Sequence, residues 1–288
     1  MLPMNYITKL QSSISNSQTV LCVGLDPVPA DFPQELRSSG RSENEMTVSF
    51  CRRVIEQTKT GAAAYKFNTA YFEALGADGF HVLNDILDAV PSGKVIIADA
   101  KRCDVPHTNA RYKTAWFDQF GFDAITLSPF LGLETLTPFL EDTRHCVYAL
   151  ALTSNPGAAD LMTRPFGSEE SLSVYIAGLL RDYAAHHDGS LGMVIGATQP
   201  EYYTSVLRAN PEAPLLIPGI GAQGGNIAEL SGALADHNGL SLINVSRGIS
   251  AIDPGSDEPW DIQVARNTDR INKSIESISQ QYQIARNE

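Results

Sequence analysis

The segment Val95-Ile96-Ile97-Ala98-Asp99-Ala100-Lys101-Arg102-Cys103-Asp104 begins as an apolar run and ends with four charged residues in six positions. Its first half predicts a buried parallel strand, because it is short and rich in branched side chains. Side chains alternate along a strand, so Asp99 and Lys101 are expected on the same side of its end. Taken alone, such a pair is more typical of a structural ion pair that caps a strand, so the rest of the chain must decide.

The composition predicts an ordinary soluble globular protein. The chain has 288 residues, of which 43% are hydrophobic and 19% charged, and its net charge is -12. Such an acidic surface makes nucleic acid and anionic membranes poor partners. The residues before Thr19 show no signal-peptide pattern, and no apolar run reaches 18 residues. Four scattered cysteines without metal spacing indicate free thiols in a reducing cytosol, so we expect a cytoplasmic protein.

Apolar runs and amphipathic segments alternate along the whole chain. The runs that predict strands are 19–25, 62–68, 94–101, 124–128, 146–153, 192–196, 214–217 and 240–245. The segments that predict the following helices are 43–60, 71–90, 108–120, 133–142, 169–187, 199–209, 224–237 and 259–285, with one more helix, 5–16, before the first strand. Thr198 and Glu201 have the spacing of a capping box. Eight strand-helix units favour a single (β/α)8 TIM barrel spanning 1–288 over a doubly wound sheet, with the last helix closing the barrel.

A barrel places chemistry at the carboxyl ends of its strands, and polar residues of this chain fall there. Asp26 follows the first strand, Lys66 and Asn68 end the second, and Thr153-Ser154-Asn155 follows the fifth. Each has a structural alternative: Asp26 and Ser154 could simply build turns before prolines, and Lys66 could reach solvent. Together they predict one mouth lined with polar groups.

A glycine-rich segment follows the seventh strand, Pro218-Gly219-Ile220-Gly221-Ala222-Gln223-Gly224-Gly225-Asn226, directly before a predicted helix. Glycines allow backbone N–H groups to approach an anion, and a helix start adds its dipole. Arg247 follows the eighth strand, where its guanidinium suits two-point contact with phosphate. These two loops form the usual phosphate site of a barrel, so the sequence predicts that an anionic ligand binds there.

These motifs resemble those of the orotidine 5'-phosphate decarboxylases, specifically the longer bacterial subgroup, type 2. The matching segments, in chain order, are Val23-Gly24-Leu25-Asp26-Pro27, Tyr65-Lys66-Phe67-Asn68, Asp99-Ala100-Lys101-Arg102, Asp104, Thr153-Ser154-Asn155-Pro156-Gly157, Gly196-Ala197-Thr198, 218–225 and Ser246-Arg247. The resemblance implies that orotidine 5'-phosphate loses CO2 to give uridine 5'-phosphate (UMP) in pyrimidine synthesis, without metal or organic cofactor.

The resemblance also implies a role for each matching residue. Lys101 would protonate C6 of the pyrimidine, and Lys66, Asp99 and Asp104 would complete a charged row with it. Asp104 and Thr108 would reach the partner's site in a homodimer. Asp26 and Lys66 would contact the ribose, Ser154 would contact the pyrimidine, and Gln223 and Arg247, beside Gly224 and Gly225, would contact the phosphate. This chain departs from the family where Cys103 replaces a usual glycine and where Pro106 and His107 stand. The placement of Asp104 depends most on that departure, and Thr108 could instead be a helix N-cap.

Two other functions compete with this one. A metal-dependent sugar-phosphate synthase on a related barrel would need surplus carboxylates around a divalent ion, whereas two lysines here balance the carboxylates of the row. A non-catalytic nucleotide-binding barrel would use the same charged row only as structure.

Overall fold

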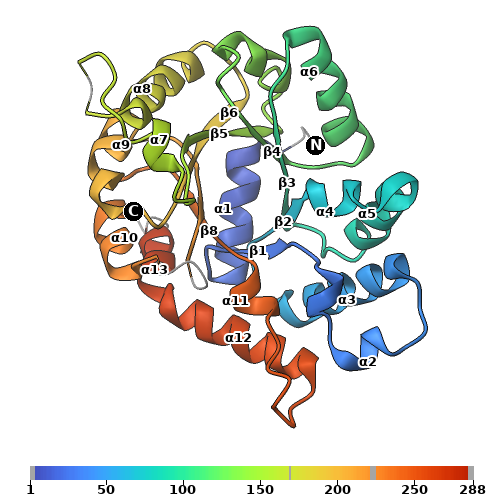
Figure 1. Cartoon of the computed structure of the whole chain (residues 1–288). Helices are drawn as coiled ribbons and strands as arrows, with labels where there is room; N and C mark the ends of the chain where they lie inside the picture. The colour runs from blue at the N-terminus through green and yellow to red at the C-terminus, as the bar shows by residue number, and fades with distance from the viewer. Residues whose placement is uncertain (1–3, 169, 221–224, 285–288) are drawn as a thin grey trace.

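The computed structural model describes residues 4–168, 170–220 and 225–284, and its centre is a closed barrel of parallel strands (Figure 1). Each strand pairs with its neighbour in the chain, and β1 pairs with β8. The strands are β1 Leu21–Leu25, β2 Ala64–Asn68, β3 Val95–Arg102, β4 Ala124–Leu127, β5 Cys146–Leu152, β6 Ser190–Ile195, β7 Leu215–Pro218 and β8 Ser241–Val245. The predicted (β/α)8 barrel is therefore confirmed.

Helices surround the barrel and cover its apolar outer face (Figure 1). They are α1 Tyr6–Ser17, α2 Gln34–Arg37, α3 Glu43–Thr58, α4 Thr69–Glu73, α5 Gly79–Leu87, α6 Pro106–Lys113, α7 Ala158–Leu161, α8 Leu172–Ala184, α9 Tyr203–Ala209, α10 Ile227–Leu234, α11 Arg247–Ser250, α12 Trp260–Ser274 and α13 Glu276–Ile284. Shorter turns of other helix types occupy Pro29–Asp31, Gly76–Asp78, Leu133–Phe139 and Pro200–Tyr202 (3₁₀) and Thr114–Gln119 (π). Among the described residues, no helix is both long and apolar enough to cross a membrane.

Helix α1 closes the amino-terminal end of the barrel. The Lys9 ammonium bonds Asp123 just before β4 at 2.6 Å, and the Ser13 hydroxyl donates to the Ala63 carbonyl just before β2 at 2.6 Å. The Tyr6 and Tyr148 hydroxyls meet at 2.8 Å inside the barrel. Packed side chains therefore fill this end of the barrel, and the cavity described below lies at the opposite mouth.

Several predicted helices differ from those observed. The segment 71–90 is broken, because a Cβ at Gly79 would lie 1.8 Å from the Phe72 carbonyl oxygen and the chain turns there through Gly76 at φ +71°. The segment 133–142 forms a 3₁₀ helix that contains Pro138, and 259–285 breaks at Ile275 into α12 and α13.

The predicted capping box at Thr198 and Glu201 is wrong. The Thr198 hydroxyl donates to the Ser154 carbonyl at 2.7 Å, and the segment 199–209 begins as a 3₁₀ turn without a side-chain cap. A capping box does exist at Ser42 and Glu45, where it starts α3.

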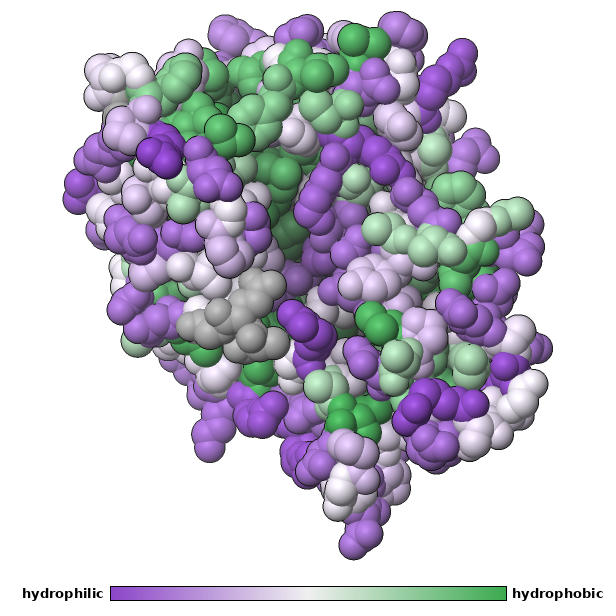
Figure 2. Space-filling model, in the orientation of Figure 1, coloured by the Kyte–Doolittle hydropathy of each residue, from purple (hydrophilic) through white to green (hydrophobic). Residues whose placement is uncertain are grey.

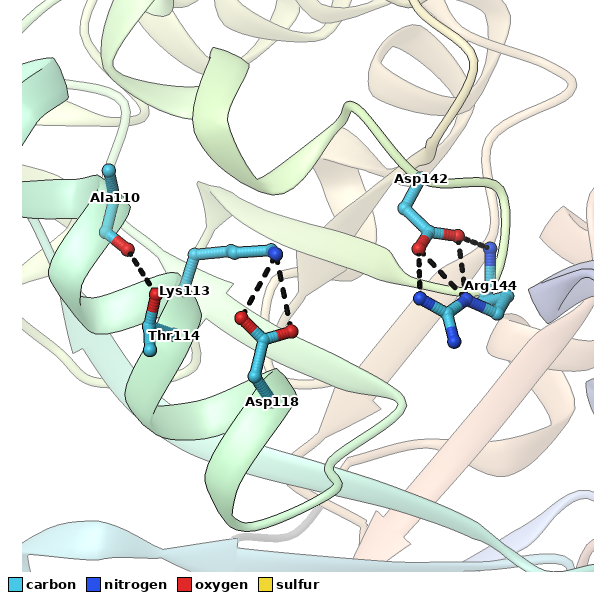
Figure 3. Close-up of polar contacts among 6 residues, drawn as sticks. All are labelled: Ala110, Lys113, Thr114, Asp118, Asp142 and Arg144. Carbon is cyan, nitrogen blue, oxygen red and sulfur yellow. Dashed lines mark hydrogen bonds and ion pairs between the residues drawn. The ribbon is translucent and has the colours of Figure 1, made fainter.

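The predicted helix 108–120 starts earlier and ends in a wider turn. Pro106 is its first residue, so Thr108 is not an N-cap. The last turns form a π-helix, and Lys113 pairs with Asp118 five positions along at 3.1 Å (Figure 3). The Thr114 hydroxyl also donates to the Ala110 carbonyl at 3.1 Å (Figure 3).

Candidate active site

A cavity of about 430 Å³ opens at the carboxyl ends of the strands, and all eight strands or the loops after them contribute to its wall. Figure 2 shows this face of the molecule hollowed at its centre. The polar lining residues are Asp26, Lys66, Asn68, Asp99, Lys101, Thr126, Thr153, Ser154, Asn155, Asn244, Ser246 and Arg247. The volume lies within the range of small-molecule sites, so the cavity can hold a ligand of nucleotide size.

Three charged side chains of the predicted row are in direct contact. Asp99 Oδ2 accepts a hydrogen bond from Lys66 Nζ at 2.7 Å, and Asp99 Oδ1 accepts one from Lys101 Nζ at 2.5 Å. Lys66 Nζ also lies 3.9 Å from Asp26 Oδ1. With Asp26 in the place predicted for Asp104, the observed row alternates in sign: Asp26, Lys66, Asp99 and Lys101, from the loop after β1 to β3.

The two lysines of the row lie in different environments. The Lys66 side chain is only 5% exposed, whereas that of Lys101 is 50% exposed. Burial alone would lower the pKa of Lys66, but Asp99 and Asp26 raise it well above its ordinary value. Lys66 is therefore a fixed buried cation, whereas the Lys101 ammonium is half exposed to water.

Asp99 is held as a carboxylate. Burial alone would raise its pKa, but the ammonium groups of Lys66 and Lys101 and their hydrogen bonds hold the pKa well below its usual range. The Thr126 hydroxyl adds a third bond to Asp99 Oδ1 at 2.9 Å. An ionised group that is 9% exposed keeps a full negative charge inside the cavity.

The backbone at Lys101 is unusual. Its φ is +46°, in the left-handed region that residues other than glycine rarely adopt. The pairing of β3 with β4 shifts register between Ala98 and Arg102, so the strand bulges where Lys101 stands. Outside the cavity, Arg102 pairs with Glu73 and its guanidinium carbon lies 5.2 Å from the centre of the Tyr112 ring. These contacts hold the end of the bulge on the side away from the cavity.

Close packing of glycines brings the loops of the mouth together. A Cβ at Gly24 would lie 1.9 Å from Ser246 Oγ, and one at Gly196 would lie 2.4 Å from the Ser154 nitrogen. The Thr198 hydroxyl holds the loop that carries Ser154. The sequence motifs around these glycines therefore position the loops that carry Ser154 and Arg247.

The predicted phosphate loops are described only in part. Gln223 and Gly224 lie outside the described residues, and the Gly225 N–H donates to the Gly219 carbonyl at 3.1 Å. Helix α10 starts three residues later than predicted, and the Asn226 side chain accepts from the N–H groups of Ala228 and Glu229. Arg247 is exposed and lines the cavity.

The structure does not bring Asp104 and Thr108 to the cavity of their own chain. Asp104 Oδ1 accepts from the Val105 N–H at 2.8 Å in the loop after β3, and neither residue is part of the cavity wall. Cys103, the departure from the family pattern, does not have a positive φ. Its Cβ is therefore accommodated without left-handed strain.

Two site residues were missed by sequence reasoning, Thr126 and Asn244. Both are buried at the cavity, and Asn244 Oδ1 has no hydrogen-bond partner within the described residues. Their signal in the sequence is a single polar residue inside an apolar strand, which is easily read as an outward-facing position.

The geometry suits a substrate on which negative charge develops, because the cationic side chains of Lys101 and Arg247 line the cavity. Lys101 can stabilise such a charge and donate a proton to it, and Lys66 and Asp99 hold the Lys101 side chain in place. Among the described residues, no group of three or more His, Cys, Asp or Glu side chains could hold a metal ion. Lys66 Nζ stands between Asp26 and Asp99, where a cation bridging the two carboxylates would lie.

Comparison with known proteins agrees with this geometry. Residues 19–255 match the model of the "Orotidine 5'-phosphate decarboxylase / HUMPS family". The orotidine 5'-phosphate decarboxylase of Herpetosiphon aurantiacus is 36% identical, over 87% of this chain and 91% of its own. That of Roseiflexus castenholzii is 37% identical, over 88% and 91%.

The same comparison holds for solved structures. That of Leishmania donovani OMP decarboxylase is 32% identical in sequence and superposes with a TM-score of 0.78, covering 96% of this chain and 99% of that one. Taken with the matching family model, these likenesses span the barrel and its mouth. The chain belongs to the orotidine 5'-phosphate decarboxylase / HUMPS family.

Proposed function

We propose that this chain removes CO2 from orotidine 5'-phosphate to give UMP in pyrimidine synthesis, with Lys101 as the proton donor to C6. The family membership and the named relatives support the reaction. The observation that carries the proposal is the row of Asp26, Lys66, Asp99 and Lys101 at the bottom of a nucleotide-sized cavity.

The reaction requires a positive charge near C6 of the pyrimidine, because negative charge develops on that carbon. The bond from C6 to the carboxylate breaks, its electron pair stays on C6, and the Lys101 ammonium gives C6 a proton. Asp99 lies beside the departing carboxylate, and two like charges about 4 Å apart repel by roughly 4 kcal/mol at an effective dielectric of 20. Relief of that repulsion as CO2 leaves corresponds to about 10³ in rate. The half-exposed Lys101 then regains its proton from water.

The remaining polar groups bind the nucleotide. Asp26 Oδ1 is buried and has no hydrogen-bond partner among the described residues, so it can accept from a ribose hydroxyl beside Lys66. Ser154 contacts the pyrimidine, whose ring lies against Leu150, Val194 and Leu216.

The phosphate is held by Arg247 with the loop that contains Gln223, Gly224 and Gly225. Within the described residues no hydrogen bond or ion pair holds the Arg247 guanidinium, so it is available to an anion. Phosphate binding far from C6 supplies energy for holding the ring against the charged row.

The proposal includes a cytoplasmic homodimer in which Asp104 and Thr108 enter the partner's site. Both residues lie outside the cavity of their own chain. Beside them, Val105, Phe130 and Leu131 are 42%, 52% and 50% exposed, which gives this side an apolar surface. Size-exclusion chromatography with light scattering and mixing of Asp104→Ala and Lys101→Ala chains tests this: one intact site per mixed dimer should restore activity.

The deciding experiment is an ultraviolet assay of orotidine 5'-phosphate loss by wild-type and Lys101→Ala protein, each with UMP affinity measured by calorimetry. We expect the substitution to abolish turnover and to spare UMP binding. Equal turnover in the two proteins would refute the role of Lys101, and UMP binding without turnover in the wild type would favour a non-catalytic barrel. Activity lost in EDTA and restored by a divalent metal would favour the metal-dependent synthase.

A further inference from the structure

Thr126, on β4, touches both reacting members of the charged row. Its hydroxyl donates to Asp99 Oδ1 at 2.9 Å and accepts from the Lys101 backbone N–H at 3.0 Å. The side chain is 1% exposed, so water does not compete for either bond. We propose that Thr126 is a positioning residue that sets Asp99 and Lys101 for the decarboxylation, an inference that rests on the proposed function.

The bulge in β3 explains why a side chain is needed at this place. Ala98 pairs with Ile125 and Arg102 pairs with Leu127, so three residues of β3 stand opposite Thr126 alone. Across this irregularity the Lys101 N–H donates to the Thr126 hydroxyl, a side-chain acceptor in place of a strand carbonyl. Without it, a backbone donor would be left unpaired beside the cavity.

The chemistry of the contact fixes the type of residue. Ionised Asp99 can only accept, so the single hydroxyl proton of Thr126 points to it, and a lone pair remains for the Lys101 N–H. The position therefore needs one donor and one acceptor on the same short side chain. Threonine and serine provide both, whereas valine provides neither.

A merely structural role is less consistent with these contacts. Two buried threonines in helices bond the backbone carbonyl one turn earlier in their own helix, Thr268 with Val264 at 2.8 Å and Thr58 with Val54 at 2.8 Å. Thr126 instead links a neighbouring strand's catalytic carboxylate to the backbone that carries the proton donor. Loss of its hydroxyl would let Lys101 leave its left-handed conformation and move Nζ away from C6.

The test compares Thr126→Val, Thr126→Ser and the control Thr268→Val in the full-length protein. Each is assayed for kcat and KM with orotidine 5'-phosphate, for UMP affinity, and for exchange of the C6 hydrogen of UMP with D2O by NMR. For Thr126→Val we expect kcat and C6 exchange to fall about tenfold to hundredfold, from the cost of an unpaired buried donor, with UMP affinity within about threefold. Thr126→Ser should recover kcat to within about threefold, and Thr268→Val should change only stability.

Several outcomes would overturn the inference. Thr126→Val with kcat and C6 exchange close to those of active wild type would do so, as would an equal loss in Thr268→Val. If Thr126→Val does not fold, Thr126→Ala against Thr126→Ser repeats the comparison with a single hydroxyl as the difference, and equal rates in these two would refute it. A wild type without turnover overturns the proposed function itself, which separates that failure from this one.

Discussion

Replacing Asp99 with asparagine should unfold this protein more easily, because it removes the main counter-charge of a buried cation. Lys66 Nζ is 2.7 Å from Asp99 and 3.9 Å from Asp26. At an effective dielectric of 20 these pairs attract by about 6 and about 4 kcal/mol, which together offset the cost of burying the ammonium. With the first removed, we expect the free energy of unfolding at pH 7 to fall by about 3–5 kcal/mol. The contact with Lys101 adds little, because that side chain is half exposed.

The measurement is urea unfolding followed by circular dichroism, with Asp142→Asn as a matched control. Asp142 also pairs with an arginine, Arg144, in Figure 3, but the two side chains are 29% and 51% exposed, so the control should lose less than about 1 kcal/mol. The Asp99 pKa is lowered in the folded state. Its stabilisation is therefore present above the unfolded pKa near 3.9 and fades as the pH falls below it, where wild type and Asp99→Asn should converge. A loss no larger than that of Asp142→Asn at pH 7 would refute the reasoning.

Three further predictions concern other parts of the chain. Gly24→Ala should raise KM at least about tenfold, because its Cβ would lie 1.9 Å from Ser246 Oγ and push the loop that carries the proposed phosphate site. Combining Gly24→Ala with Ser246→Gly should bring KM part of the way back. An unchanged KM in the single variant would contradict this. Burial lowers the pKa of both His145 and His237 in the folded protein. The unfolded chain therefore binds more protons near pH 6, and the free energy of unfolding should rise from pH 5 to pH 7. Urea titrations at several pH values measure this rise, and a flat profile would argue against neutral rings in the folded protein. Cys103→Gly should leave kcat within about twofold, because Cys103 has no positive φ to relieve, and a sharply higher kcat would show that the Cβ hinders the loop.

The strands could be predicted from the sequence, because every one is an apolar run buried between the helices and the barrel interior. Strand alternation predicted Asp99 and Lys101 on the same side, and the structure does bring their heads to 2.5 Å, but at a bulge with a left-handed backbone at Lys101 and not along a regular strand. Helix ends were predicted less well. The Thr198 hydroxyl, which has capping spacing, bonds the Ser154 carbonyl from a different strand loop instead, and local spacing cannot reveal a tertiary partner.

The site was predictable where motifs carry charge and hidden where the contact depends on register. Thr126 occupies the middle of an apolar strand, and the bulge in β3 makes its hydroxyl the partner of both Asp99 and Lys101. No periodicity in the sequence marks that bulge. Asp104 was predicted to complete the row and to reach a partner's site, and in its own chain it lies in the loop after β3, outside the cavity.

The left-handed backbone at Lys101 lowers the free energy of unfolding, so stability and turnover favour different residues at this position. Holding a residue with a Cβ at φ +46° costs roughly 1–2 kcal/mol, a penalty that glycine escapes and asparagine bears lightly. The half-exposed ammonium returns at most about 1 kcal/mol through its bond to Asp99. Laboratory evolution that selects for heat resistance alone should therefore favour glycine or asparagine at position 101, giving more stable chains without the proposed proton donor.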